Sequence, residues 1–461
     1  MIELVLAAND VDSIRNGLTG GTVEGCAILY ASQTMRADST VRLLVREVEF
    51  AASGDYSRRG WLEAELNPEL VARVSKRARR ENYALVFVHS HPGIDPPIFS
   101  SVDTQGEERL AAFLSHRHPG LAHTALVVSE GGMQARRLGS TEYIRVVGIG
   151  INREVLFDPM LPAPSTSDMF DRQVRAFGSA GQLELQRLRI AIVGLGGMGS
   201  LVAQQLVHLG VRDFILVDPD TLESTNLNRV TNAIPDDIGR PKVEIAERYI
   251  HSVADNATVA RVDGDVTRVS TARELLNADF IFGCTDSHGS RAVLQQVSYQ
   301  YLIPLIDMGT TIVASNGRVT HIYGRVQLLA PGLACLTCNE LLNASEVRRD
   351  MMTAFERQAD PYLQGAREPA PAVISLNGTV ASLAVTMLLS VICGVPVSAR
   401  HLLYNALGSV LRTVRAQPDP ECYICSRSGS FARGDSWPLL ARQDPSALDA
   451  SELVGVPDVE N

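Results

Sequence analysis

The first third of the chain mixes short apolar runs with segments of helical periodicity. The runs that have the length and β-branched content of strands are Val23–Tyr30, Val41–Phe50, Ala84–His89 and His123–Ser129. Apolar residues spaced three and four apart predict helices near Pro68–Glu81 and Val102–Ser115. This mixture predicts one compact α+β domain over residues 1–148.

The pattern changes at residues 149–167, where Asp158–Asp168 gathers three prolines with Ser, Thr and Asp, the composition of a linker. From Leu188 onward, short Val- and Ile-rich runs alternate with helical segments such as Lys242–Val253. Strands alternating with helices predict an α/β domain with a largely parallel sheet and helices on both faces. We assign this domain to residues 168–426 and interpret the polar residues 427–461 as a tail.

One apolar stretch raises the question of a membrane span. Val380–Val397 carries no charge, but it contains several hydroxyl side chains and the helix-breaking Gly394. About four helical turns precede the break, which suits a buried core helix better than a span of ~20 residues. We therefore expect no membrane insertion.

Composition narrows the class of protein further. The formal net charge of -10 gives no general attraction to nucleic acid or to an anionic membrane. The segment MIELVLAANDVDSIRNG lacks a basic leader, so a cytoplasmic location is expected. Seven cysteines in a chain of 461 residues without such a leader argue against a disulfide scaffold.

A glycine-rich turn opens the second domain. Gly194, Gly196, Gly197 and Gly199 in VGLGGMGS follow a predicted strand and begin a predicted helix. Glycines let the backbone approach a phosphate or ribose closely, and the helix N-terminus offers unpaired N–H groups. Asp218, at the end of the next predicted strand, can hold ribose hydroxyls. The motif predicts a Rossmann-like nucleotide site and leaves NAD and a nucleoside triphosphate open.

Charged residues further along the chain favour the triphosphate. Arg229 and Lys242 follow in DPDTLESTNLNRV and GRPK, and Asp286 follows an apolar strand in CTDSHGSR. Two cations can bind phosphate oxygens, and a carboxylate can bind Mg²⁺. This set of charges therefore suits a nucleoside triphosphate better than a nicotinamide. Over roughly Asp168–Ser426, these motifs resemble the ThiF/MoeB-like ubiquitin-activating-enzyme family.

This resemblance implies ATP-dependent adenylation of the C-terminal carboxylate of a ubiquitin-like protein, with pyrophosphate as product. Carried over to this chain, the glycines at 194–199 line the nucleotide and Asp218 binds its ribose. Asn226 and Arg229 contact phosphates.

The same resemblance assigns the remaining charged residues. Lys242 stabilises the transferring charge and Asp286 holds Mg²⁺. Arg172 in FDRQ falls where the family has an arginine that reaches across a homodimer to the partner's ATP, and an exposed surface arginine is the alternative. A homodimer formed through the adenylation domain is therefore expected.

Four cysteines occur as two Cys-x-x-Cys pairs, Cys335 with Cys338 and Cys422 with Cys425. Four thiolates suit one tetrahedral structural zinc, which is closed and noncatalytic. Reduced core thiols are the alternative, and the family resemblance favours the zinc.

The cysteine content of one segment bears on the fate of the activated acyl group. Family members that form a thioester carry a cysteine in the crossover segment before the last helix of the domain, and Asn343–Asn377 has none. The resemblance thus predicts adenylation without an enzyme thioester. Transfer to a separate carrier or conjugating enzyme, or to a Ser or Thr of that segment, stays open.

The stretch FVHSHPGIDPPIFSSVD contains residues that suit a second kind of functional site. His89 and His91 occupy alternate positions at the end of a predicted strand, so both imidazoles face the same side. Asp103, at the start of the next predicted helix, can supply an oxygen ligand and leave a fourth position for water. This pattern predicts an open, catalytic zinc site, and ordinary strand residues are the alternative.

A water bound to such a zinc needs a general base. Glu24 in VEGCAILYAS begins an apolar strand, where an unpaired carboxylate is costly to bury, and an exposed edge residue is the alternative. The set that resembles the JAB/MPN metalloprotease family over residues 1–148 is Glu24, His89, Ser90, His91, Pro92, Gly93, Ser100 and Asp103.

By that resemblance the two histidines and Asp103 ligate zinc. Glu24 is the general base and Ser100 stabilises the tetrahedral oxyanion. The family hydrolyses isopeptide or peptide bonds after the C-terminus of ubiquitin-like proteins. The spacing from His91 to Ser100 is one residue longer than in the family motif, so Ser101 is an alternative to Ser100.

The two resemblances belong to one pathway. We expect a bifunctional enzyme of a bacterial-type ubiquitin-like modification system that uses ATP, Mg²⁺ and two zinc ions. One zinc is catalytic in the protease domain and the other is structural in the adenylation domain. The alternatives are activation of a sulfur-carrier protein for cofactor or cysteine biosynthesis, and a scaffold that binds a ubiquitin-like tail without catalysis.

Overall fold

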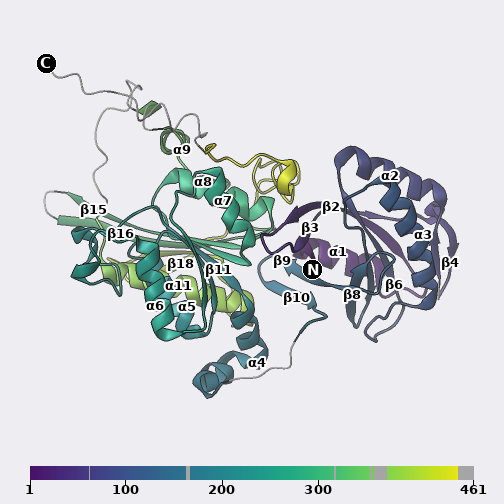
Figure 1. The fold of residues 1–461 in the computed structure, drawn as a ribbon, viewed down its shortest axis with the longest axis horizontal. Coiled ribbons are helices and arrows are strands. Elements are labelled where there is room, and N and C mark those ends of the chain that lie inside the picture. Colours follow the sequence, from purple (N-terminus) through teal and green to yellow (C-terminus); the bar gives the residue numbers. More distant parts are fainter. Residues whose placement is uncertain (62, 162–166, 316–317, 354–355, 358–370, 445–461) are drawn as a thin grey trace.

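Two domains lie side by side in the computed structural model (Figure 1). The structure describes residues 1–461 except 62, 162–166, 316–317, 354–355, 358–370 and 445–461. We call residues 1–157 the N-terminal domain and residues 168–444 the C-terminal domain.

A barrel-like sheet forms the N-terminal domain. Its strands run in the order β1-β3-β2-β6-β7-β8-β9-β10, and an additional parallel pairing of β1 with β9 closes the ring. The elements are β1 (Ile2–Ala7), α1 (Ala8–Leu18), β2 (Cys26–Met35), β3 (Val41–Phe50), β4 (Tyr56–Arg59), β5 (Ala64–Leu66), α2 (Pro68–Glu81), β6 (Ala84–Ser90), α3 (Ser101–Arg117), β7 (Thr124–Ser129), β8 (Gly132–Arg137), β9 (Tyr143–Ile149) and β10 (Arg153–Phe157).

Local signals fix α2 where the sequence predicts it. The Asn67 side chain accepts a hydrogen bond from Leu70 N, Pro68 occupies the first turn, and Asn82 ends the helix in the left-handed conformation at φ 55°. The apolar side of α2 packs with α3 on the face of the sheet formed by β2 and β6. This packing brings the start of α3 to the end of β6.

The predicted domain boundary is wrong by about ten residues. The sequence predicts a linker from 149, but β9 extends to Ile149 and β10 pairs with it in antiparallel register. The side chain of Asp158 is also only 3% exposed, and it pairs with Arg145 and Arg187. The linker prediction rested on prolines that begin only after Asp158, so the strand before them was missed. The rest of the predicted linker includes 162–166, which lie outside the described residues.

A mixed eight-stranded sheet forms the C-terminal domain, in the order β13-β12-β11-β14-β15-β16-β17-β18. In that order, neighbouring strands from β13 to β15 are parallel, and those from β15 to β18 are antiparallel. The prediction of a parallel sheet is therefore correct for the first half of the sheet and wrong for the second. The elements are α4 (Asp171–Arg187), β11 (Arg189–Val193), α5 (Gly199–Leu209), β12 (Asp213–Val217), α6 (Lys242–Val253), β13 (Thr258–Val262), α7 (Val269–Glu274), β14 (Phe280–Gly283), α8 (His288–Gln300), β15 (Leu305–Ser315), β16 (Arg318–Leu329), α9 (Ala344–Asp350), α11 (Ile374–Cys393), β17 (His401–Asn405) and β18 (Val410–Thr413).

Most of the apolar stretch Val380–Val397 lies in α11, which ends at Cys393. Within the described part of the chain, α11 is the one helix long and apolar enough to cross a membrane, a test that core helices also pass. It packs against α4, α5, β15 and β16, and 56% of its most apolar window is buried. The helix thus has the packing of a core helix in this structure.

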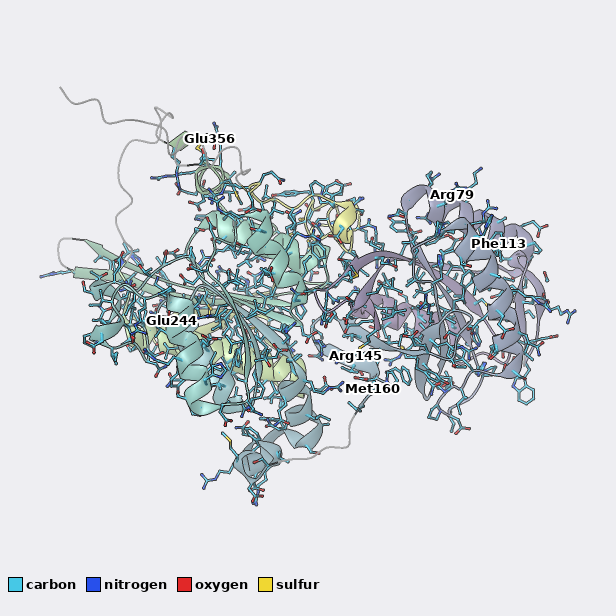
Figure 2. All side chains as sticks on the ribbon, viewed as in Figure 1. Arg79, Phe113, Arg145, Met160, Glu244 and Glu356 are labelled. Atoms are coloured by element: carbon cyan, nitrogen blue, oxygen red, sulfur yellow. The ribbon has the colours of Figure 1, made fainter. Side chains whose placement is uncertain are left out.

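Apolar and charged contacts join the two domains. Val5, Leu44 and Val147 of the N-terminal sheet belong to the same buried cluster as the core of the C-terminal domain. A charge network surrounds them, and Arg145 lies at this junction (Figure 2). The network consists of Glu3, Arg36, Arg42, Arg145, Arg153, Asp158, Glu184, Arg187 and Asp279.

Residues 426–444, which we call the strap, correct the prediction of a polar tail from 427. The strap runs between the C-terminal domain and β2 (yellow in Figure 1). Phe431 is 4% exposed and Ala432 is fully buried. Arg46 of β3 donates to the Arg427 carbonyl at 2.9 Å, and Thr34 of β2 donates to Asp435 at 2.8 Å. The polar composition misled the prediction, because these polar groups bind other parts of the chain.

Candidate functional site

The glycine-rich turn between β11 and α5 depends on the absence of side chains. Gly194 has φ 89°, and a Cβ there would lie 2.8 Å from the Cys284 carbonyl oxygen. A Cβ at Gly199 would lie 1.8 Å from the Gly194 carbonyl oxygen. At Gly196 a Cβ would meet nothing within 4 Å. The turn is therefore closed on its protein side and open at Gly196.

A cavity of about 740 Å³ lies against this turn. It is bounded by the ends of β11, β12 and β14 and by the start of α11, the edge of a parallel sheet where nucleotide ligands bind. The predicted nucleotide residues that line it are Gly194, Gly196, Gly197, Asp218, Asn226, Arg229, Lys242 and Asp286. Gly199 lies beneath the turn as the first residue of α5.

Asp218 and Lys242 form the centre of the charge pattern in this pocket. Asp218 is buried and accepts hydrogen bonds from the backbone N–H groups of Leu195 (2.5 Å) and Asp220 (2.9 Å). Burial raises the pKa of Asp218, and the nearby Lys242 ammonium opposes this shift. Lys242 Nζ lies 2.7 Å from Asp220 Oδ2 and 4.0 Å from Asp218 Oδ1. Asp218 thus orders the glycine turn as well as facing the pocket.

Arg229, Asn226 and Asp286 approach the pocket from two loops. The Arg229 guanidinium donates to the Thr225 carbonyl at 2.7 Å, and its stem lies 3.3 Å from the position of a Cβ on Gly197. Asn226 is buried, whereas Asp286 is exposed after β14. A cation, an amide and a carboxylate around one cavity suit a nucleotide triphosphate with Mg²⁺.

Two further lining residues were not assigned from the sequence. Arg291 donates to the Thr285 carbonyl at 3.0 Å and lies 3.4 Å from the buried Asp307 carboxylate. Asn377 of α11 accepts from the Thr310 hydroxyl at 3.2 Å. Arg291 is the last residue of the motif CTDSHGSR, so the sequence near Asp286 could have indicated it. Asn377 could not be found in this way, because nothing in the sequence places α11 against the glycine turn.

Arg172 stands apart from this pocket. It lies in the first turn of α4, is exposed, and is absent from the pocket lining of its own chain. Its predicted action on a partner's ATP in a homodimer stays a prediction.

The four paired cysteines meet at one point. Cys335 Sγ lies 3.6 Å from both Cys338 Sγ and Cys422 Sγ, and Cys338 Sγ lies 3.5 Å from Cys425 Sγ. The Cys425 thiol donates to Cys335 and lowers the Cys335 pKa to about 6. All four sulfur atoms lie within 4.8 Å of one another, an arrangement that fits one tetrahedral zinc.

Replacing Cys335 by serine is expected to remove one equivalent of zinc and to lower Tm by roughly 5–10 °C, because binding free energy at a structural zinc contributes to folding. Metal analysis and thermal unfolding of the purified protein measure both quantities. Cys393→Ser, in α11 and outside the cluster, is the control and should leave the zinc content unchanged. Equal zinc in the Cys335 variant and the wild type would contradict the assignment.

A second potential metal cluster joins β6 to α3. His89 Nε2 lies 3.2 Å from His91 Nε2 and 3.3 Å from Asp103 Oδ1, and His91 Nε2 lies 3.6 Å from Asp103 Oδ2. Hydrogen bonding to Asp103 raises the pKa of His91. Burial acts to raise the Asp103 pKa, but hydrogen bonds from the histidines hold it well below the ordinary value. Two imidazoles and one carboxylate, with ligand atoms within 4.8 Å, fit an open zinc site.

Glu24 and Ser100 border this cluster in different ways. Glu24 is 5% exposed, and its Oε1 lies 3.9 Å from His91 Nε2. Burial raises the pKa of Glu24. Ser100 caps α3, because its hydroxyl accepts from Asp103 N at 3.1 Å while Asp103 Oδ2 accepts from Ser100 N at 2.6 Å. The cap orients Asp103, and the predicted oxyanion role of Ser100 stays a prediction.

Residues 170–424 match the ThiF family. The chain belongs to the ThiF family. The match ends two residues before the strap and leaves the N-terminal domain outside it, so the JAB/MPN resemblance of residues 1–148 stays a prediction.

Curated proteins similar to this chain align with the ThiF region. The SAMP-activating enzyme E1 of Haloferax volcanii is 25% identical over 254 residues, covering 55% of this chain and 85% of its own. The molybdopterin-synthase adenylyltransferase of Escherichia coli is 26% identical over 260 residues, covering 56% and 96%. The ubiquitin-like modifier-activating enzyme 5 of Oryza sativa is 28% identical over 248 residues, covering 50% and 54%.

Among solved structures, Escherichia coli MccB with ATP is similar at a TM-score of 0.46 and 19% sequence identity. The alignment covers 58% of this chain and 76% of that one.

Proposed function

We propose that the ThiF region catalyses ATP-dependent adenylation of the C-terminal carboxylate of a ubiquitin-like or sulfur-carrier protein. The observation that carries this proposal is the convergence of the predicted nucleotide residues on one cavity. The names of the similar curated proteins, an adenylyltransferase and two activating enzymes, support it.

The charges around the cavity have separable tasks in such a reaction. The carboxylate of the carrier attacks the α-phosphorus of ATP, and the bond to pyrophosphate breaks. Arg229 and Lys242 lie where they can bind phosphate oxygens and stabilise the charge that develops on them. Asp286 would hold Mg²⁺, which neutralises phosphate charge when it is bound.

ATP–pyrophosphate exchange by the purified chain tests the adenylation. The candidate carrier is a ubiquitin-like protein with a free C-terminal carboxylate, and the exchange is expected only when both carrier and Mg²⁺ are present. Exchange that is independent of any carrier, or is absent with every carrier offered, would argue against the proposal.

The acceptor of the activated acyl group separates two pathways. The crossover segment has no cysteine, so direct transfer to a conjugating enzyme or to a sulfur donor fits better than an enzyme thioester. Mass spectrometry of the carrier distinguishes them, because thiocarboxylate formation exchanges one oxygen for one sulfur. Both pathways fit a homodimeric enzyme of the cytoplasm, and the proposal includes that state and location.

A specific observation favours a second function in the N-terminal domain. The His89, His91 and Asp103 cluster fits an open zinc site, and Glu24 lies beside it with a raised pKa. We propose that this site hydrolyses peptide or isopeptide bonds after the C-terminus of the same class of carrier, either in a precursor or in a conjugate. Zinc supplies an activated water when bound, and Glu24 would take the proton of that water and deliver it to the leaving amine.

Glu24→Gln is expected to lower cleavage of a carrier fusion by at least about 100-fold, because general bases contribute on that order. The zinc content should stay that of the wild type, since Glu24 is not one of the three potential ligands. His89→Ala is the comparison, because it should lose both the metal and the cleavage. Full cleavage by the Glu24 variant would contradict the proposed role and leave adenylation unaffected.

A further inference from the structure

The strap ends on a wall of the nucleotide pocket. Residues 264–266 line the pocket, and the Arg442 guanidinium of the strap forms an ion pair with Asp265. Arg442 Nη2 also lies 2.8 Å from the Thr267 hydroxyl. Backbone bonds reinforce the contact, because Arg442 N donates to the Thr267 carbonyl at 2.6 Å and Val269 N donates to the Arg442 carbonyl at 2.9 Å. The strap therefore adds one rung of β-type pairing to the loop behind this wall.

A second strap residue holds the neighbouring turn. Asp444 accepts from the Ser270 hydroxyl at 2.7 Å and from Ser270 N at 3.0 Å, at the start of α7. Arg442 Nη1 lies 3.4 Å from the Met352 carbonyl oxygen, beyond α9. Arg442 thus joins the pocket wall to the crossover segment.

The middle of the strap is also fixed. Asp435 accepts from Thr34 of the N-terminal domain at 2.8 Å and from Tyr301 at 3.1 Å, and Arg273 lies 2.9 Å away. The strap is consequently held at its middle and near its C-terminal end, and Arg442 has a defined position relative to the pocket. The ThiF match stops at 424, so the strap residues that make these contacts lie outside the matched region.

We propose that Arg442 is a positioning residue for the nucleotide, an inference that rests on the proposed adenylation. Phosphates are assigned to the glycine turn and ribose to Asp218, at the end of β12. The base then lies toward the wall formed by residues 264–266, which follow the neighbouring strand β13. Arg442 neutralises Asp265 and holds this wall, and so fixes the surface that receives the adenosine.

The test compares Arg442→Gln with the wild-type full-length chain. Direct calorimetric titration with ATP gives Kd. Pyrophosphate exchange at saturating carrier gives kcat and the KM for ATP, and a carrier titration at saturating ATP gives the KM for the carrier. We expect Kd and KM for ATP to rise about tenfold, with kcat within about twofold and an unchanged KM for the carrier, because the lost contact orders the ground-state site. Arg442→Lys should recover part of the ATP affinity.

Arg433→Gln is the matched control within the strap. Its guanidinium bonds to the Gly429 carbonyl at 2.6 Å and covers the Trp437 ring, and it does not contact the pocket wall. Unchanged ATP affinity in Arg442→Gln, or the same loss in Arg433→Gln, would overturn the inference. If Arg442→Gln fails to fold, Asp265→Asn probes the same ion pair and should weaken ATP binding in the same direction; unchanged ATP affinity in that variant would likewise overturn it.

The binding measurement separates this inference from the proposed function. Wild-type protein that binds ATP but exchanges no pyrophosphate with any carrier contradicts the adenylation alone, because the Kd of the Arg442 variant still decides the positioning role. Wild-type protein that binds no ATP overturns both.

Discussion

Pyrophosphate exchange is expected to fall by at least about 100-fold when Asp286 is replaced by alanine, because fixed charges that act on a transferring phosphoryl group commonly contribute that much. Asp286 follows β14, where a parallel strand ends at the pocket, and its side chain is exposed there. Loss of the carboxylate removes the proposed oxygen ligand of Mg²⁺, whereas Arg229 and Lys242 stay in place to bind phosphate. The expected defect is therefore larger in kcat than in ATP binding.

Two further variants make this result specific. Asp286→Asn keeps an oxygen ligand without its charge and should retain intermediate exchange, with a raised Mg²⁺ requirement. Asp255→Ala removes an exposed carboxylate outside the pocket lining and should exchange like the wild type. If Asp286→Ala exchanged pyrophosphate at the wild-type rate, the Mg²⁺ ligand would have to be another group.

Asp279→Ala is expected to lower the free energy of unfolding by about 3–5 kcal/mol, as when one partner of a buried ion pair is removed. Asp279 Oδ1 lies 2.8 Å from Arg36 Nη2 and 3.9 Å from Arg153 Nη2, and Oδ2 accepts from Arg189 N at 3.0 Å. The side chain of Arg36 is 11% exposed and that of Arg153 is 3% exposed. The variant would leave both buried guanidinium groups without the Asp279 carboxylate, with the more distant Glu3 (3.7 Å from Arg36) and Glu184 (3.6 Å from Arg153) beside them.

Chemical denaturation measures this loss, and a double variant identifies its cause. Asp279→Leu with Arg36→Met replaces the pair by apolar side chains and should recover a large part of the stability, because most of the cost of the single change is an uncompensated charge. An Asp279→Ala protein as stable as the wild type would show that the junction does not depend on this pair.

The Asp279 carboxylate also makes the free energy of unfolding depend on pH. Burial acts to raise the pKa of Asp279, but Arg36 and Arg153 outweigh it and hold the pKa below its ordinary value of 3.8. A carboxyl group whose pKa is lower in the folded state than in the unfolded state stabilises the fold fully at any pH above the unfolded-state pKa. This stabilisation is lost as the pH falls through the folded-state pKa. The wild type should therefore lose more stability than Asp279→Ala on acidification below about pH 4.

Local signals carried the successful part of the sequence interpretation. The apolar spacing predicted α2, and the alternation of strands and helices predicted α6, both with their observed bounds. The Asn67 cap and the first-turn proline of α2, and Pro241 before α6, are local signals that agree with these bounds. The glycine turn and the paired cysteines were found because close backbone approach and metal geometry impose a spacing on the sequence. These features need no knowledge of distant contacts.

The features that were missed depend on partners far away in the sequence. Strand β10 is short and lies next to a proline-rich stretch, and its place in the sheet comes from pairing with β9. The strap has a polar composition, and its burial comes from contacts with β2 and β3. Asn377 reaches the nucleotide pocket only because α11 packs against the sheet.

The closure of the N-terminal sheet by β1 and β9 has a consequence for biosynthesis. Ile2–Ala7 leaves the ribosome well before its parallel partner Tyr143–Ile149, which is translated later. Until then the first strand has an unpaired edge, and a nascent chain in that state is exposed to aggregation. The junction with the C-terminal domain is completed later still, when Phe431 emerges. The edge of β1 should thus be protected from aggregation only after Tyr143–Ile149 has been translated.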